Sequence, residues 1–522
     1  MIDVRIDRDI RVPTSVQLAL AVMIGTLAGG IIILDLPLKW KAALIIAIGF
    51  ASAVAVVRST KSVLLLAVAL MIPFSVGTGL PAILAHPQHI GLSGAVFIQL
   101  VDVLILALLL GHLARMATHQ AEFRVFPSIT VPALVWVFAS ALSAENARDP
   151  TLSLIQIFHM CRLLISCVVL ANVLEEPKHV NWLLIGLLLG TAFQGLLGTY
   201  QALAAKPAGL EFLGEASDAF PLGLDEGVAY RASGTIGHPN GYATYLSTTL
   251  PLAVAIMFSR PARAQSVLAG TALGIGGLGL VFSLSRGGWI AFALAFLLVL
   301  SFAVKLGRVS LRVALGVGLV ATLVLLGLEL TNSDLIASRF RSDDRGSATS
   351  RLTQAQGALA MLRDYPATGI GLNNWSLRVR EYGMASVVRY NGLVIVHNIY
   401  LLIAAETGII GLLAFLWLLS ALLVHAWRFA THPAPVSAWV TGAGLLAGFV
   451  ALMVHGLADY DLLANLRVFG LFWLLAAMAV SIDRLLASES QAPRSQLQQS
   501  MTSYPVGTRD REHHLTSHIG RS

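Results

Sequence analysis

Long uninterrupted runs of apolar residues dominate the chain, and their length suits the hydrocarbon core of a membrane. A helix needs about 20 apolar residues to cross that core, and unbroken runs favour helices over alternating strands. The pattern predicts an all-α, polytopic integral membrane protein with about fourteen transmembrane helices. The runs lie at residues 15–34, 40–57, 62–79, 92–112, 127–145, 152–174, 182–204, 242–258, 267–284, 288–304, 312–330, 398–424, 437–458 and 467–485.

The composition excludes a soluble domain. Of the 522 residues, 56% are apolar and 12% are charged, whereas soluble domains carry about 25% charged residues. The apolar surface must therefore face lipid, which accepts only helices and closed barrels. The net charge of +7 is not clustered as in a nucleic-acid-binding patch. We therefore expect membrane lipids, and no nucleic acid, among the partners.

Basic residues in the short loops predict the orientation, because such residues are enriched on the cytoplasmic side. Lys39 and Lys41 are the exceptions. We therefore place both termini in the cytoplasm, and we expect the first run to be an uncleaved anchor. With fourteen spans, the following basic residues share one side: Arg5, Arg8, Arg11, Arg58, Lys61, Arg115, Arg124, Arg260, Arg263, Lys305 and Arg308.

Two outward segments are too long to be simple turns, and they divide the chain. In the second, Ser350 is a candidate N-cap of a helix that Pro366 would end. The tail is rich in Gln, Ser and Arg, which is typical of disorder, and the spacing of its histidines fits no metal motif. The predicted segments are N-terminal spans (1–204), a first outer loop (205–241), central spans (242–330), a large helical outer loop (331–397), C-terminal spans (398–486) and a cytoplasmic tail (487–522).

A glycine-rich pattern and a pair of cysteines both lie inside apolar runs. Residues 274–279 fit G-x-G-x-x-G, but they lie inside a membrane run without a preceding strand. Small residues that let helices approach closely explain this run better. Cys161 and Cys167 fall inside one apolar run, which excludes a disulfide framework.

Ionisable residues inside spans are rare, and they usually face the protein interior. Asp102 lies in the fourth run, His159 and Arg162 in the sixth, and Glu406 in the twelfth. Asp102 and Arg162 could neutralise each other across two helices, which is a structural role, or they could act in catalysis. Glu406 follows His397 by nine residues, which on a straight helix places the two on opposite faces, about 13.5 Å apart along the axis. We therefore expect Glu406 to pack against neighbouring helices.

Three residues at the outer ends of spans suggest chemistry. Arg231 precedes the eighth run, Arg286 lies in a tight Ser-Arg-Gly-Gly turn, and His397 opens the twelfth run. Two permanently charged guanidinium groups could bind a dianion such as pyrophosphate, and a histidine could exchange a proton near neutral pH. Alternatively, the arginines bind lipid headgroups and His397 only caps a helix.

Together these segments resemble the O-antigen ligase and O-antigen polymerase family of bacterial membrane glycosyltransferases. The resemblance covers roughly residues 225–425. Its motifs are R-x-x-G-x-x-x-H-P-N at 231–240, S-R-G-G at 285–288, Arg351 followed by Y-P-A-T-G-I-G at 365–371, His397-Asn398, and E-T-G-I-I-G at 406–411.

The resemblance implies a metal-independent glycan transfer without a cofactor, at the periplasmic face of the bacterial inner membrane. The implied donor is an undecaprenyl-pyrophosphate-linked glycan, and the implied acceptor is a saccharide or the lipid A core. By this analogy, Arg231 and Arg286 bind the pyrophosphate, and Arg351 is a secondary anion contact. His238 and Asn240 are further expected substrate-binding residues, and His397 is the candidate catalytic base.

Three functions stay open at this point. The first is the glycosyltransferase, either a ligase that attaches a finished glycan or a polymerase that joins repeat units. The second is a transporter or flippase of a lipid-linked anionic substrate, although transporters usually bind near the midplane on related repeats. The third is a non-catalytic scaffold of an envelope assembly.

Overall fold

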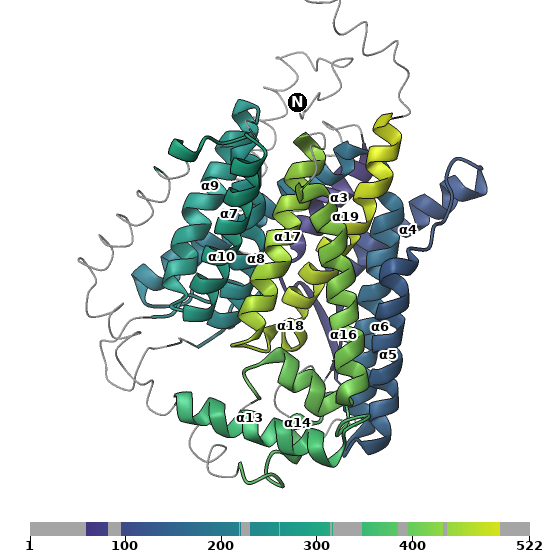
Figure 1. Ribbon diagram of the computed structural model, residues 1–522, viewed down its shortest axis with the longest axis vertical. Helices are drawn as coiled ribbons and strands as arrows, with labels where there is room; N and C mark the ends of the chain where they lie inside the picture. Colours follow the sequence, from purple (N-terminus) through teal and green to yellow (C-terminus); the bar gives the residue numbers. More distant parts are fainter. Residues whose placement is uncertain are drawn as a thin grey trace, which may run out of the picture.

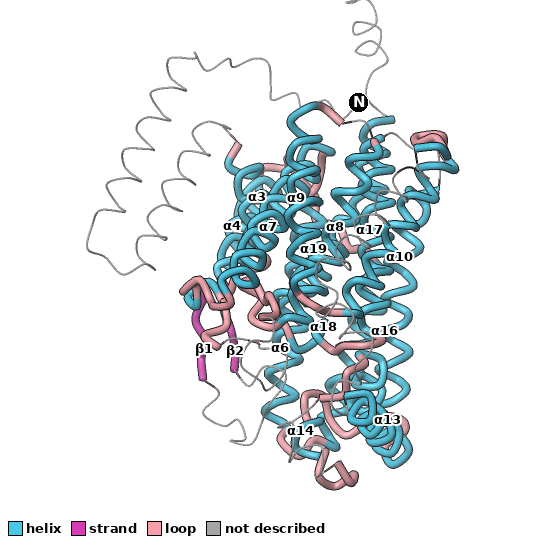
Figure 2. The backbone as a smooth tube through the Cα atoms, turned by 90° about the vertical axis from the view of Figure 1, so that its left-hand side faces the viewer, coloured by secondary structure: helices cyan, strands magenta, loops and turns pink. Residues whose placement is uncertain are grey.

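The computed structural model describes residues 59–81, 95–218, 220, 230–259, 261–313, 316, 347–384, 395–431 and 436–490. These residues form an elongated helical bundle with a short hairpin at its side (Figures 1 and 2). The elements in chain order are α3 (Thr60–Met71), β1 (Gly77–Pro81), β2 (Ala95–Gln99), α4 (Leu100–Ala117), α5 (Pro127–Ser143), η1 (Ala144–Asn146), α6 (Pro150–Val173), α7 (Pro177–Ala204), η2 (Glu211–Leu213), α8 (Pro239–Phe258), α9 (Arg263–Phe282), α10 (Arg286–Lys305), α13 (Ser347–Asp364), α14 (Trp375–Arg378), α16 (Ile399–Thr431), α17 (Val436–Gly456), α18 (Asp461–Ala464) and α19 (Leu466–Ser490).

The predicted all-α, polytopic membrane architecture is confirmed. Within the described residues, nine helices are long and apolar enough to cross a membrane, and Thr60–Met71 and Leu466–Ile482 are shorter apolar helices. Each predicted span within these residues overlaps one of those helices, but the run at 62–79 is helical only to Met71, and its last residues belong to β1. The runs at 15–34 and 40–57, most of the run at 312–330 and most of the tail lie outside the described residues. The total number of spans stays a prediction.

Apolar side chains cover the outer faces of the peripheral helices. In α4, for example, Val103, Leu106, Leu110 and Leu113 are exposed at helical spacing. Such a stripe is unfavourable in water and compatible with lipid. By contrast, α8 and α17 are buried along most of their length, so they form the centre of the bundle.

The glycine-rich run of α9 acts through close packing. A side chain at Gly276 would meet Thr191 of α7, and one at Gly279 would meet Tyr242 and Gly195. The small residues thus allow α7, α8 and α9 to approach one another closely, as predicted.

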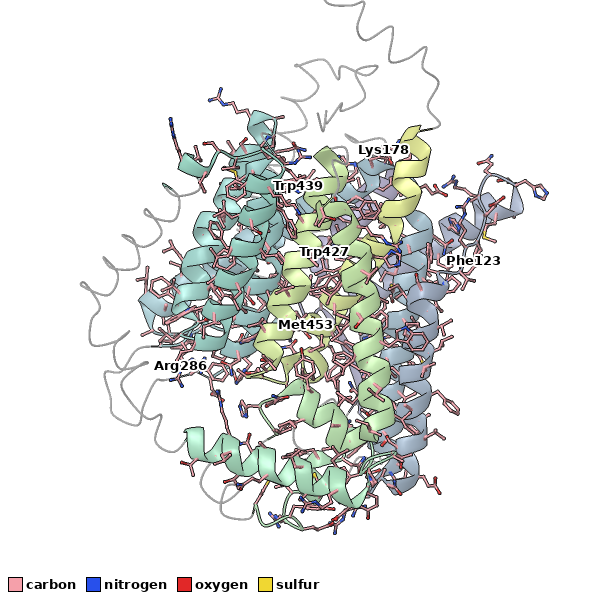
Figure 3. All side chains as sticks on the ribbon, in the orientation of Figure 1. Phe123, Lys178, Arg286, Trp427, Trp439 and Met453 are labelled. Carbon is pink, nitrogen blue, oxygen red and sulfur yellow. The ribbon has the colours of Figure 1, made fainter. Side chains whose placement is uncertain are left out.

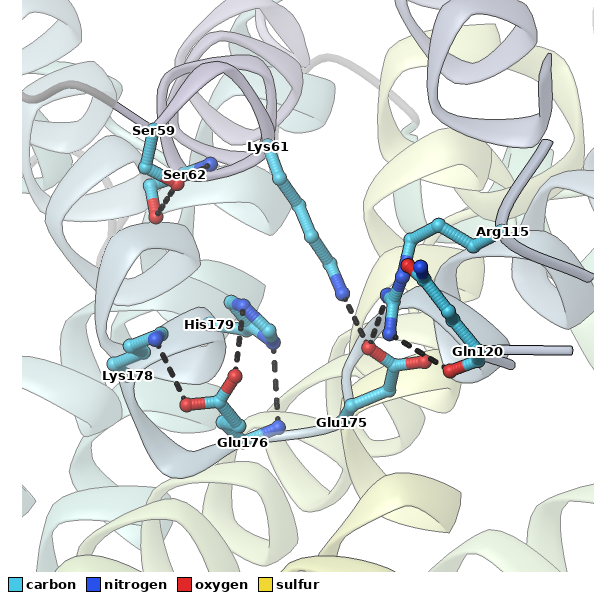
Figure 4. A network of polar contacts seen from close by, with 9 residues as sticks. All are labelled: Ser59, Lys61, Ser62, Arg115, Gln120, Glu175, Glu176, Lys178 and His179. Carbon is cyan, nitrogen blue, oxygen red and sulfur yellow. Dashed lines mark hydrogen bonds and ion pairs between the residues drawn. The ribbon is translucent and has the colours of Figure 1, made fainter. Parts of the chain in front are cut away.

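Several basic residues gather at one end of the bundle. Glu175, between α6 and α7, accepts hydrogen bonds from Lys61 of α3 at 2.7 Å and from Arg115 of α4 at 2.6 Å (Figure 4). Figure 3 shows Lys178 at this end and Arg286 at the opposite end. The basic loops of the described chain therefore share one side.

The fourth span begins later than the run at 92–112 predicts. Residues 95–99 instead form β2, which pairs antiparallel with β1. The backbone N–H of Gln99 donates to Asp102 at 2.7 Å, forming half of a capping box that starts α4 at Leu100. Asp102 also forms an ion pair with Arg162 of α6. The expected neutralising pair is thus present, and Asp102 has a capping role as well.

Helix α16 is broken at Gly408, where the backbone adopts φ 68° and ψ −172°. Residues 366–371 of the outer loop form hydrogen bonds across the break. Ile409 donates to the carbonyl of Pro366 at 2.9 Å, and Ile370 donates to that of Ala405 at 2.9 Å. A side chain at Gly408 would come within 2.2 Å of the Ala367 oxygen. The Y-P-A-T-G-I-G and E-T-G-I-I-G motifs therefore form one joint between the outer loop and the bundle.

Glu406 lies at the centre of this joint, as a packing residue. Its side chain is 1% exposed, and it accepts hydrogen bonds from the backbone N–H of Asn373 at 2.9 Å and of Trp375 at 3.0 Å. On the other side of the same loop, Asn374 accepts from the N–H of Asp149, just before α6, at 2.8 Å. The loop is thus attached to α6 as well as to α16.

The outer loop contains the predicted helix, with a different start. Helix α13 already includes Ser347, so Ser350 lies inside it and is not its N-cap. Instead, the Ser350 hydroxyl accepts a hydrogen bond from Gln354 at 3.0 Å. The helix ends at Asp364, before Pro366, as expected. Helices α13 and α14 lie across the end of the bundle (Figure 1).

Because the backbone at Gly408 packs against the outer loop, we expect Gly408→Val to lower the free energy of unfolding. Valine would face the Ala367 carbonyl and would need an unfavourable positive φ, so we expect a loss of about 1–3 kcal/mol. Gly274→Ala is the matched control, because a side chain there meets nothing within 4 Å. Thermal unfolding of the purified protein in detergent measures both. Equal midpoints for the two variants would contradict the role of the joint.

Candidate functional site

Four chain segments place polar side chains at the end of the bundle opposite the basic loops. Three of them precede or start helices α8, α10 and α16, and the fourth follows α17. Figure 3 shows Arg286 at this end, above α13. Every segment leaves or enters a helix of the bundle here, and two of these helices, α8 and α17, are buried along most of their length.

Arg231 is held against the turn that carries Arg286. Its Nε donates to the carbonyl of Ser283 at 3.0 Å, and its Nη2 donates to Oδ1 of Asn240 at 2.8 Å. The backbone of Ala232 also donates to Phe282 at 3.0 Å. The two motifs R-x-x-G-x-x-x-H-P-N and S-R-G-G, which are far apart in sequence, therefore meet.

The S-R-G-G turn begins α10. Ser285 is the N-cap and accepts from the N–H of Gly288 at 3.4 Å, so that Arg286 becomes the first helical residue. Leu284 before it adopts a left-handed φ of 52°. The backbone at Gly287 packs closely against the His455 ring, so that a side chain at position 287 would come within 2.7 Å of that ring.

Asp459, which the sequence reasoning missed, connects these parts. It follows α17, is 3% exposed, and accepts from Nδ2 of Asn240 at 2.5 Å. Burial alone would raise its pKa, but His455, His397, Asp461 and His238 together lower it below the ordinary value. Asp459 is therefore a buried carboxylate that interacts electrostatically with three histidines.

His455 in α17 was also missed. Its Nε2 lies 3.3 Å from the Ser285 hydroxyl, and its Nδ1 contacts the Thr244 hydroxyl of α8. It thereby links α8, α10 and α17 beneath Arg286. The segment H-G-L-A-D-Y-D at 455–461 offered one signal, namely ionisable residues at the outer end of a span.

His397 is held by the outer loop. Its backbone N–H and its Nδ1 each lie 3.2 Å from Oε1 of Gln354 in α13. Burial lowers its pKa, Asp459 raises it and Arg351 lowers it, with a net shift below the ordinary value. The ring also contacts Tyr460 edge-on, with centroids 5.3 Å apart. His397 is therefore neutral at neutral pH.

The remaining predicted residues divide into two groups. His238 occupies the N-cap position of α8 without a side-chain capping bond. Burial beside Arg231 and His397 lowers its pKa to about 4 despite the opposing charge of Asp459. Asn240 uses both amide atoms inside the protein, between Arg231 and Asp459. Arg351 is exposed on α13 and acts electrostatically on His397. Asp102, Arg162 and Glu406 have partners of their own and are outside this cluster.

Metal binding has no support in the described part of the chain. There, no three His, Cys, Asp or Glu side chains are arranged to hold a metal ion. Within the cluster, Asn240 is hydrogen-bonded to both Arg231 and Asp459. The arrangement thus places guanidinium groups and an imidazole near a buried carboxylate.

The two neighbouring carboxyls should respond oppositely to amide substitution. Burial and Asp459 raise the pKa of Asp461 well above its ordinary value, so folding is favoured at low pH, and this contribution is lost as pH rises through the raised pKa. Asp461→Asn resembles the protonated form, so it should be at least as stable as wild type at pH 8, with a smaller difference at pH 4.

Asp459→Asn is the opposite case, because both carboxylate oxygens accept hydrogen bonds, from Asn240 and from the backbone N–H of Tyr460. The amide of an asparagine would turn its own N–H groups toward one of these donors. We expect it to lose about 1–3 kcal/mol. Thermal unfolding across this pH range compares the two variants. Equal destabilisation by both at pH 8 would contradict the assigned charges.

The sequence model of the O-antigen ligase family matches residues 271–416. No curated protein matches the chain significantly. The matched segment contains Arg286, Arg351, His397 and Glu406, whereas Arg231 and Asp459 lie outside it. The match confirms the resemblance seen in the motifs over residues 271–416 of this chain.

Proposed function

We propose that the protein transfers a glycan from an undecaprenyl-pyrophosphate-linked donor to a saccharide acceptor, as an O-antigen ligase or polymerase. The transfer takes place at the periplasmic face of the bacterial inner membrane. The observation that carries this proposal is the meeting of the Arg231 segment, the Arg286 turn and His397 around Asp459, at the end opposite the basic loops.

His397 is suited to act as the base because of its tautomer. A backbone N–H can only donate, so the Gln354 atom that it contacts must be the oxygen. Nδ1 contacts the same oxygen and must therefore carry the ring proton. In a neutral imidazole, this leaves the lone pair on Nε2. Gln354 thus prepares His397 to accept a proton.

The proposed reaction is one displacement. The acceptor hydroxyl oxygen attacks the anomeric carbon of the donor, and its proton moves to Nε2 of His397. The bond between that carbon and the pyrophosphate oxygen breaks, and its electron pair leaves with the pyrophosphate. Arg231 and Arg286 stabilise the growing negative charge, and Asp459 stabilises the imidazolium that forms.

The position of the cluster favours this function over transport. Transporters usually bind their substrates near the bilayer midplane, whereas these residues lie at helix ends. Purified protein in vesicles, supplied with donor on the leaflet that these residues face, separates the two functions. A chemically unchanged donor would indicate a transporter.

Arg231→Met, Arg286→Met and His397→Ala should each abolish surface polysaccharide. Removing one charge-stabilising group or the base slows such reactions on the order of 10²–10³-fold. The test is the polysaccharide profile of a deletion strain that carries each variant, with membrane levels checked by immunoblot. Arg363→Met, an exposed arginine of α13 outside the cluster, is the control. Normal polymer in all three variants would refute the proposal.

The deletion strain itself separates the two activities of the family. Loss of all long chains on lipid A indicates a ligase. Chains reduced to a single repeat unit indicate a polymerase.

Gln354 variants should change the pH dependence of transfer. In Gln354→Glu, a carboxylate beside Nδ1 raises the pKa of His397. Because the base must be neutral, the acid limb of the rate profile moves to higher pH. Gln354→Leu should lower the rate about tenfold without an upward shift, since it no longer selects the tautomer. Initial rates of the purified variants from pH 5 to 9 test this, and unchanged profiles in both would contradict it.

A further inference from the structure

A cavity of about 410 Å³ lies beside the cluster, between the ends of α8 and α19. Its walls come from the loop after η2, the Ile236–His238 segment, α18 and the start of α19. Polar side chains supply much of its lining, namely His238, Tyr460, Asp461, Asn465 and Arg467. Ligand pockets have volumes of about 300–1,000 Å³, so this cavity is large enough for one sugar ring.

Arg467 provides a positive charge without a matching carboxylate. Its Nη1 donates to the carbonyl of Ile236, and no ion pair with Arg467 is present among the described residues. Gly214 and Gly237 make room for the guanidinium, since a side chain at Gly214 would come within 2.5 Å of Nη2. The Arg467 side chain is half-buried at the wall of the cavity, so an anionic ligand in the cavity would gain a charge-assisted hydrogen bond with it.

Groups suited to hydroxyls line the same cavity. Asp461 and His238 each have a buried polar atom, Oδ2 and Nδ1, that forms no hydrogen bond within the described chain. Such atoms are uncommon in native proteins and call for an explanation. Tyr460 adds an aromatic ring.

The cavity adjoins the proposed reacting centre. Tyr460 lines it and contacts the His397 ring. His238 also lines it and interacts electrostatically with both Arg231 and His397. A ligand in the cavity would therefore be separated from the proposed base by Tyr460 and from Arg231 by His238.

We propose that this cavity is a glycan subsite for a pyranose ring that carries a carboxylate, which Arg467 binds. The inference rests on the proposed function for the identity of the ligand as a sugar of the transferred glycan or its acceptor. The planar fork of an arginine matches a carboxylate in two parallel hydrogen bonds. The other polar groups of the cavity bind ring hydroxyls.

Binding of monosaccharide probes tests the subsite without turnover. Saturation-transfer NMR on the full chain in nanodiscs compares methyl β-D-glucuronide with methyl β-D-glucoside. We expect wild type to prefer the glucuronide on the order of tenfold, the effect of a charge-assisted hydrogen bond. Arg467→Met should remove the preference, and Arg467→Lys should keep part of it. Ala216→Trp, which fills the cavity, should abolish binding of both sugars.

Two controls separate this inference from the proposed function. Arg363→Met should behave as wild type, and Arg286→Met should keep the glucuronide preference although it loses transfer. Equal binding of the two sugars by wild type, or a preference that survives Arg467→Met, would overturn the subsite. Displacement of the glucuronide by inorganic pyrophosphate in wild type and equally in Arg286→Met would instead identify a phosphate site, which also overturns it.

Discussion

The break in α16 at Gly408 is the constraint on which the arrangement of the site depends. A broken helix inside a bundle leaves N–H and carbonyl groups unpaired, which is costly where water is excluded. Here residues 366–371 supply the missing partners, and Glu406 binds the N–H groups of the next residues. The outer loop is thereby fixed to the helix that His397 precedes, and α13 can present Gln354 to the imidazole.

The cluster also contains a buried carboxylate, that of Asp459. Buried carboxylates are unfavourable unless they are paired and hydrogen-bonded. Asp459 is hydrogen-bonded by Asn240 and by the backbone N–H of Tyr460, and its neighbour Asp461 has a pKa raised well above the ordinary value. Asn240 in turn orients Arg231, so the carboxylate and the guanidinium are linked through an amide. The polar groups are thus positioned before any substrate is present, which is what charge stabilisation in a transition state requires.

The site lies at the ends of helices, where charged side chains are less costly than they are within the spans. Within the spans, Asp102 and Arg162 neutralise each other, in keeping with the high cost of an isolated charge there. At the outer end, the Ser285 side chain caps α10, and His238 occupies the N-cap position of α8 without a side-chain capping bond. The His238 segment also borders the Arg467 cavity.

The sequence by itself determined the membrane architecture, because apolar runs of spanning length have no other stable environment. It also identified Arg231, Arg286 and His397, since polar residues at the ends of such runs are conspicuous. Gly276 and Glu406 were likewise assigned to packing from spacing alone.

Only the tertiary structure decided which of these residues meet. Asp459 and His455 lie more than 50 residues after His397 in sequence, and Gln354 is an ordinary residue of an amphipathic segment. Their roles come from hydrogen bonds between distant segments, and the start of α4 likewise depends on a capping bond rather than on hydrophobicity. The hydrophobic pattern predicts where a single helix lies and which of its faces is apolar. It does not predict which residues of distant helices come into contact, and those contacts define the site.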